Sequence, residues 1–84
     1  MKASFGRDEA MAMLCELAVA KNPDLKVSED SHLEQDLGFD SLDRMHLMFR
    51  FRERYGVTIT AEDYIERKLG IVRNLLDFLS ASVR

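Results

Sequence analysis

Ser41 is the residue of this chain that is best placed for covalent chemistry. Asp40 is a good N-cap residue, because its carboxylate can accept a hydrogen bond from a backbone N–H of the first helical turn, and Asp43 completes the capping pattern. A helix is therefore predicted to begin at Ser41, and Gly38 allows a sharp turn just before it. An anion on the Ser41 hydroxyl would lie near unpaired N–H groups and the positive end of the helix dipole. The geometry suits a phosphodiester on Ser41.

The helix predicted to follow Ser41 has two apolar faces. One stripe has the width of a core-facing helix surface, and a second strip lies on roughly the opposite side. One helix of a small chain cannot easily bury both, so the second strip is predicted to be a docking surface. The core stripe comprises Leu47, Met48, Phe51 and Tyr55, and the docking strip comprises Leu42, Met45 and Phe49, with His46, Arg52 and Glu53 beside it.

The segment around Ser41 resembles the Leu-Gly-x-Asp-Ser-Leu signature of acyl carrier proteins, whose serine carries 4′-phosphopantetheine. In that family the serine lies a little before mid-chain and opens the second helix, and the resemblance extends from about Phe5 to the C-terminus. It implies an all-α fold, namely a small four-helix bundle of the acyl-carrier type with a long loop between helices 1 and 2 and a short third helix. The matching residues are Leu37-Gly38-Phe39-Asp40-Ser41-Leu42.

The sequence before Ser41 predicts one helix and one loop. Apolar residues recur at helical spacing from about Phe5 or Arg7 to about Ala20, and Asn22-Pro23 ends the pattern. Residues 23–38 have no period and predict a long ordered loop whose leucines hold it to the core.

The sequence after the Ser41 helix predicts two further helices. Gly56 can supply a left-handed helix end, and residues 57–59 favour extended backbone. Thr60 is predicted to cap a short helix in which Tyr64 and Ile65 turn inward. After Gly70, a broad apolar face predicts a last helix that anchors the bundle.

Length and composition predict a single domain over residues 1–84, because the chain is too short for a second core. With 46% hydrophobic and 32% charged residues it reads as a globular chain. The one cysteine, Cys15, cannot form an internal disulfide and is expected to be a buried, inert thiol. No apolar run has transmembrane length and no signal peptide is recognised, so a cytoplasmic protein without a membrane partner is expected. No internal repeat, low-complexity tract or flexible linker is found, so a discrete protein is expected.

The residues give little support to a metal site or to hydrolase chemistry. Neither His32 nor His46 has a second histidine or a cysteine at metal-ligand spacing, so no metal site is predicted and both are interpreted as surface residues. On a helix, Ser41 and His46 lie about 140° apart, too far for His46 to act as a general base. The chain is predicted not to be an enzyme, because a domain of this size rarely supplies a catalytic pocket.

Four arginines in the helix after Ser41 raise the question of nucleic-acid binding. At about 100° per residue they spread around the helix axis instead of forming one stripe, and two acids interrupt the positive field. With a net charge of −3, the chain is predicted not to bind nucleic acid. The arginines are Arg44, Arg50, Arg52 and Arg54, and the acids are Asp43 and Glu53.

The family resemblance implies a mechanism. A phosphopantetheinyl transferase would use coenzyme A to modify Ser41, with Asp40 positioning the serine and Leu42 supporting docking and the helix start. An acyl-loading ligase or acyltransferase and a ketosynthase or other acyl-processing enzyme would then dock on the second helix, and the chain would shuttle among them as a monomer. The docking residues are Asp43, Met45, His46, Phe49, Arg52 and Glu53; the residues implied to line an acyl pocket, or otherwise to be plain core, are Leu47, Phe51, Ile59 and Tyr64.

The sequence departs from the family pattern in the charge of the second helix. Carriers of fatty acid synthesis typically have a strongly acidic second helix, whereas His46 and Arg52 stand at matching positions here. This predicts a specialised carrier of a fatty-acid, polyketide or related secondary-metabolite pathway with dedicated partners. An aminoacyl or D-alanyl-type carrier remains an alternative, as does a non-catalytic helical interaction domain without a prosthetic group.

Overall fold

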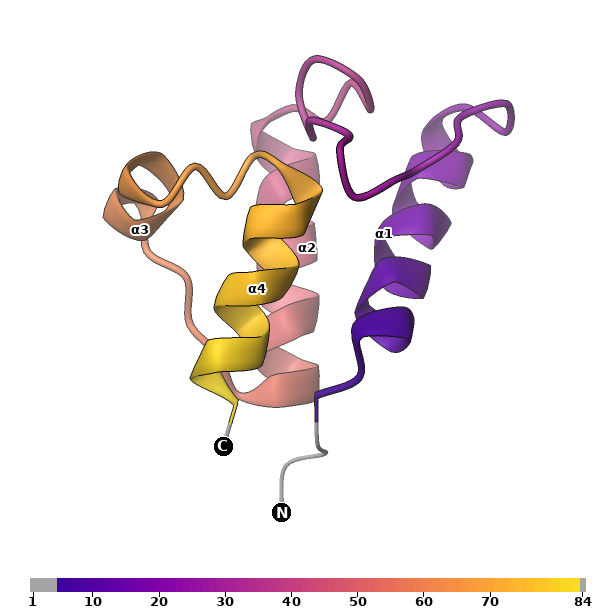
Figure 1. Cartoon of the computed structure of the whole chain (residues 1–84). Coiled ribbons are helices and arrows are strands. Elements are labelled where there is room, and N and C mark those ends of the chain that lie inside the picture. Colours follow the sequence, from indigo (N-terminus) through magenta and orange to yellow (C-terminus); the bar gives the residue numbers. More distant parts are fainter. Residues whose placement is uncertain (1–4, 84) are drawn as a thin grey trace.

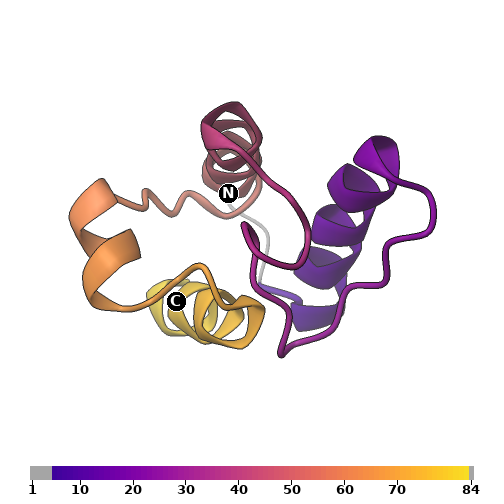
Figure 2. The same ribbon diagram turned by 90° about the horizontal axis from the view of Figure 1, so that it is seen from above.

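Four helices make up most of residues 5–83, the part of the chain that the computed structural model describes. In Figures 1 and 2, three of them stand around a common centre, and the short α3 lies on the side away from α1. No β-strand occurs within residues 5–83, so the predicted all-α four-helix bundle is confirmed. The helices are α1 (Arg7–Lys21), α2 (Ser41–Tyr55), α3 (Ala61–Glu66) and α4 (Val72–Ser82).

The core lies where the apolar faces of α1, α2 and α4 meet. Each helix contributes fully buried side chains at helical spacing, and burial of this apolar surface is the main force that holds so small a bundle together. The core stripe predicted for α2 is confirmed, with Met48 at its half-buried edge. The largest fully buried side chains are Phe51, Leu14, Leu33, Leu47, Leu69, Leu75, Leu76, Leu79 and Val72.

A polar cluster joins the start of α1 to the end of α2. Glu9 accepts hydrogen bonds from Arg54 Nε at 2.9 Å and from the Tyr55 hydroxyl at 2.6 Å. Arg54, and then Tyr55, lower the pKa of Glu9 to about 2. Burial, and then the Glu9 carboxylate, raise the pKa of Tyr55 to about 12. Glu9 is therefore charged and Tyr55 neutral at pH 7.

The long loop before α2 is ordered against the connection between α3 and α4. The Leu33 N–H donates to the Gly70 carbonyl at 2.7 Å, and an isolated antiparallel bridge pairs His32 with Ile71. Leu33 and Leu37 are buried, which confirms that leucines hold this loop to the core. The loop is thus a fixed support for Ser41.

Glycines end the loop and α2 as predicted. Gly38 has φ of 69° and Gly56 has φ of 73°, a left-handed backbone that costs glycine little. Gly56 forms the C-cap of α2, and Thr60 caps α3 by accepting the Asp63 N–H at 3.0 Å.

Three side chains depart from the sequence predictions. Ile65 is 74% exposed instead of inward-facing, because the six-residue α3 turns its Tyr64 side toward the bundle and places Ile65 about 100° away. Cys15 is half-buried, since it lies one position past the buried Leu14 at the edge of the α1 stripe. His32 is not a plain surface residue, because it is half-buried and its Nδ1 accepts backbone N–H groups of the loop.

None of the helices in the described residues has the length and apolar character needed to cross a membrane.

Candidate functional site

Ser41 is the first residue of α2 and is exposed. The predicted capping box is present: the Asp43 N–H donates to Asp40 Oδ1 at 2.9 Å, and the Asp40 N–H donates to Asp43 Oδ2 at 3.1 Å. These bonds satisfy two backbone donors that a helix start would leave unpaired. The capping box therefore fixes where α2 begins and holds the Ser41 hydroxyl at the surface.

An ion pair ties the start of α2 to the end of α1. Lys21 Nζ donates to Asp43 Oδ2 at 2.5 Å, and this contact is the main reason that the pKa of Asp43 is lowered. Lys21 was not among the predicted site residues, because nothing local in the sequence pairs residues 22 positions apart.

Arg44 is a second site residue that the sequence analysis did not single out. Its Nη2 donates to Ser41 Oγ at 3.3 Å, and its Nη1 lies 3.5 Å from Glu34 Oε1. The guanidinium also stacks on the Tyr64 ring, 5.2 Å from the centroid. The contact with Tyr64, and then the charge of Glu34, raise the pKa of Arg44 above its ordinary value. The pattern placed Arg44 only within a set of four arginines, whereas the fold places it beside the serine.

A groove of about 650 Å³ lies between α2 and α3, and Ser41 is one of its lining residues. Ile59 and Tyr64, two of the four residues predicted to line an acyl pocket, lie in its wall. Leu47 and Phe51 do not, because they are fully buried on the core side of α2. The complete lining is Ser41, Arg44, Met45, Met48, Phe49, Arg52, Thr58, Ile59, Thr60, Ala61, Tyr64 and Ile65.

The predicted docking strip is exposed on α2. Leu42 is 73%, Met45 66% and Phe49 57% exposed, and Met45 and Phe49 also line the groove. Ile65 of α3 adds an apolar side chain on the far wall of that groove. The apolar surface beside Ser41 is thus wider than the α2 strip alone.

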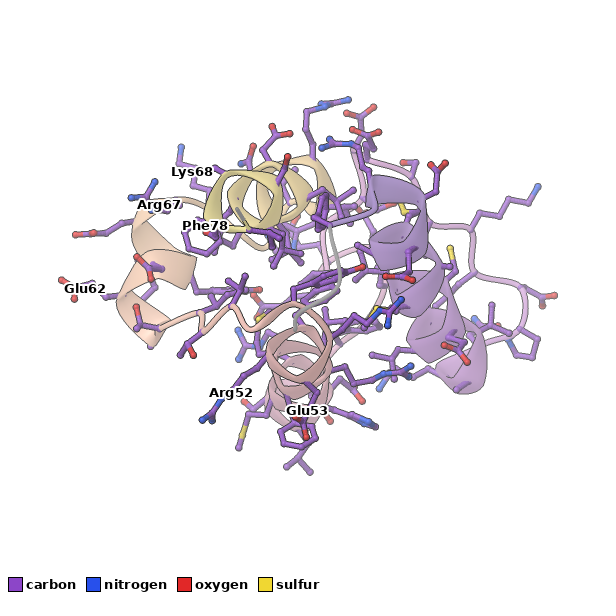
Figure 3. All side chains as sticks on the ribbon, turned by 90° about the horizontal axis from the view of Figure 1, so that it is seen from below. Arg52, Glu53, Glu62, Arg67, Lys68 and Phe78 are labelled. Carbon is purple, nitrogen blue, oxygen red and sulfur yellow. The ribbon has the colours of Figure 1, made fainter. Side chains whose placement is uncertain are left out.

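The charged side chains of α2 are mostly engaged with other elements. Arg44, Arg50 and Arg54 pair with acids of the loop and of α1, with an Arg50 Nη2 to Glu16 Oε2 distance of 3.4 Å. Within residues 5–83, Arg52 has no ion-pair partner, and it extends from α2 on the side that faces α3 (Figure 3). Of the four arginines, Arg52 is therefore the positive charge available to a partner at the groove.

Within the described part of the chain, no three His, Cys, Asp or Glu side chains gather as metal ligands would. His46 is exposed on α2, close to the docking strip in sequence.

Comparison with known proteins identifies the family. Residues 11–79, most of the chain, match the family model described as the phosphopantetheine attachment site. The chain belongs to this family. It is also similar to an acyl carrier protein of Chloroherpeton thalassium (strain ATCC 35110 / GB-78), with 32% identity over 54 residues. That alignment spans 64% of this chain and 65% of the relative's length.

The prosthetic group of the family is covalently bound 4′-phosphopantetheine, and the surroundings of Ser41 fit it. Arg44 Nε is buried and has no hydrogen-bond acceptor in the structure, although the neighbouring Nη2 already contacts Ser41 Oγ. A phosphate attached to Ser41 would supply the missing acceptor. Ser41 is the predicted attachment residue.

Proposed function

We propose that this chain is an acyl carrier: Ser41 carries 4′-phosphopantetheine, and the chain presents acyl groups on that arm to other enzymes. The observation that carries the proposal is the exposed Ser41 at the capped start of α2, where it lines the groove, in a chain of the phosphopantetheine attachment family. When bound, the arm supplies a thiol that holds an acyl group as a thioester.

The residues around Ser41 orient the attachment point instead of catalysing a reaction. The Asp40–Asp43 capping box keeps Ser41 at a fixed helix start, and Lys21 holds Asp43 in place from α1. A rigid attachment point with a flexible arm keeps the cargo at high effective concentration near a docked enzyme. The chemistry belongs to the partners, which on this proposal are a phosphopantetheinyl transferase, an acyl-loading ligase or acyltransferase, and a ketosynthase or similar enzyme.

The docking surface for these partners is the exposed strip of Leu42, Met45 and Phe49. Large exposed apolar side chains next to the reactive residue are typical of interaction sites, and a helix face offers them at regular spacing. Ile65 extends this surface across the groove. A partner that covers the strip would bring its active site close to Ser41.

The charge beside this strip favours dedicated partners. Arg52 has no ion-pair partner in residues 5–83 and lines the groove, so a partner with arginines and lysines would meet like charge there. This supports a specialised pathway with enzymes that present acidic groups to α2.

Exchange of Arg52 for glutamate is expected to raise kcat/KM with standard fatty-acid enzymes about threefold, because charge at an interface rim acts mainly on the association rate. Steady-state kinetics at low and high salt measure this. Lys68→Glu is the matched control, since Lys68 also has no ion-pair partner within residues 5–83 but projects from the turn just after α3 (Figure 3). Equal rates for the wild type and the Arg52 variant at low salt would contradict the charge argument.

The attachment itself is tested by intact mass after incubation with coenzyme A and a broad-specificity phosphopantetheinyl transferase. The wild type is expected to gain one phosphopantetheinyl group, and Ser41→Ala is expected to gain none. A known carrier modified in parallel shows that the enzyme is active. No gain in the folded wild type would refute the carrier proposal in favour of a helical interaction domain without a prosthetic group.

A further inference from the structure

We propose that Arg44 binds the phosphodiester that joins the arm to Ser41, and so anchors the root of the arm to the Arg44–Tyr64 wall of the groove. This inference rests on the proposed function, because it takes Ser41 as the attachment residue. Arg44 belongs neither to the capping box nor to the docking strip.

The contacts of the Arg44 guanidinium leave one of its edges only partly used. Nη1 faces Glu34 at 3.5 Å, while Nη2 donates to Ser41 Oγ at 3.3 Å. Nε is buried without an acceptor, and it lies on the same side of the planar guanidinium as Nη2. Such an edge carries two parallel N–H donors whose spacing matches two oxygens of a phosphate. A phosphodiester on Ser41 would therefore occupy the edge whose donors are now incompletely used.

Contacts from two other elements hold this guanidinium in place. The Tyr64 ring of α3 stacks on it at 5.2 Å, and Glu34 of the long loop pairs with it from another side. The Tyr64 hydroxyl also lies 3.5 Å from Glu34 Oε1, so the two supports contact each other. Much of the side-chain freedom that phosphate binding would cost is thus already lost.

The charges around Ser41 make Arg44 the cation on which a phosphate depends. Asp40 and Asp43 flank Ser41, and a phosphodiester adds a further negative charge beside them. Lys21 is engaged with Asp43. Among the positively charged side chains of residues 5–83, Arg44 is the one that donates a hydrogen bond to Ser41 Oγ. Without it, the helix start alone would have to offset the repulsion.

The test is a thermodynamic cycle between modification of Ser41 and substitution of Arg44. The wild type, Arg44→Gln and the control Arg52→Gln are each unfolded in urea before and after attachment of phosphopantetheine, with intact mass confirming modification. Arg52→Gln removes the same charge from the same helix and the same groove. Modification is expected to lower the equilibrium constant of unfolding about tenfold in the wild type and in the control. This is the stabilisation that one additional hydrogen bond to a charged group would give. In Arg44→Gln this gain is expected to vanish.

The outcomes separate this inference from the proposed function. An equal gain in all three proteins would overturn the role of Arg44 and leave the carrier proposal standing, whereas failure of the wild type to accept the group would overturn both.

The wild type also gives an independent measurement that needs no variant. On modification, its Arg44 Nε–H resonance is expected to move downfield and to exchange more slowly with water. An unmoved resonance would overturn the proposed phosphate contact.

Discussion

Replacement of Phe51 with alanine is expected to lower the free energy of unfolding by about 3–5 kcal/mol, which is the usual cost of removing a buried aromatic ring. Phe51 is the largest fully buried side chain within residues 5–83, and its ring lies 6.2 Å from that of Tyr55. Since a small domain is stable by only about 5–15 kcal/mol, this loss would leave a marginal fold. Urea unfolding followed by circular dichroism measures the change.

Phe49→Ala is the matched control for Phe51→Ala. It removes the same side chain from the same helix two positions away, but Phe49 is 57% exposed. Its effect on stability is expected to be within about 0.5 kcal/mol, as for most surface substitutions. Similar losses for the two variants would show that the two faces of α2 have been assigned incorrectly.

The two faces of α2 and its starting residue could be predicted because they depend on local physics. A capping box needs only residues three positions apart, and Asp40 and Asp43 provide it. An apolar stripe needs only helical spacing, so the buried Phe51 and the exposed Phe49 were distinguished from sequence. The lack of room for a second core then implied that one face stays exposed.

The contacts that hold the Arg44 guanidinium beside Ser41 could not be predicted, because they join residues far apart in the chain. Arg44 meets Glu34 only because the long loop turns back over α2, and it meets Tyr64 only because α3 packs on that side. The periodicity of a six-residue helix is also too short to decide which side faces inward, which is why Ile65 was assigned wrongly.

Replacement of Gly70 with alanine is expected to lower the free energy of unfolding, because Gly70 lies in the α3–α4 connection that supports the groove. A Cβ at Gly70 would lie 3.0 Å from His32 Nε2 and 3.2 Å from the Tyr64 hydroxyl. The His32 ring cannot retreat freely, because its Nδ1 accepts the N–H groups of Glu34 and Gln35. The Tyr64 ring is held by its stack on the Arg44 guanidinium. The methyl group must therefore displace one of two constrained rings, at a cost of about 1–3 kcal/mol.

Urea unfolding of Gly70→Ala beside Gly6→Ala separates this packing effect from the general effect of replacing glycine with alanine. A Cβ at Gly6 meets only the Glu9 Cβ at 3.5 Å, an ordinary contact. Gly6 is the N-cap of α1, where alanine is less favourable than glycine, so Gly6→Ala is expected to lower stability by no more than about 1 kcal/mol, without a packing clash. Because Tyr64 lines the groove, Gly70→Ala is also expected to shift the NMR signals of the Arg44 guanidinium, whereas Gly6→Ala is not. Unchanged stability in the Gly70 variant would mean that the loop yields easily. The long loop and α3 would then support the Ser41 end of the groove less firmly than their contacts imply.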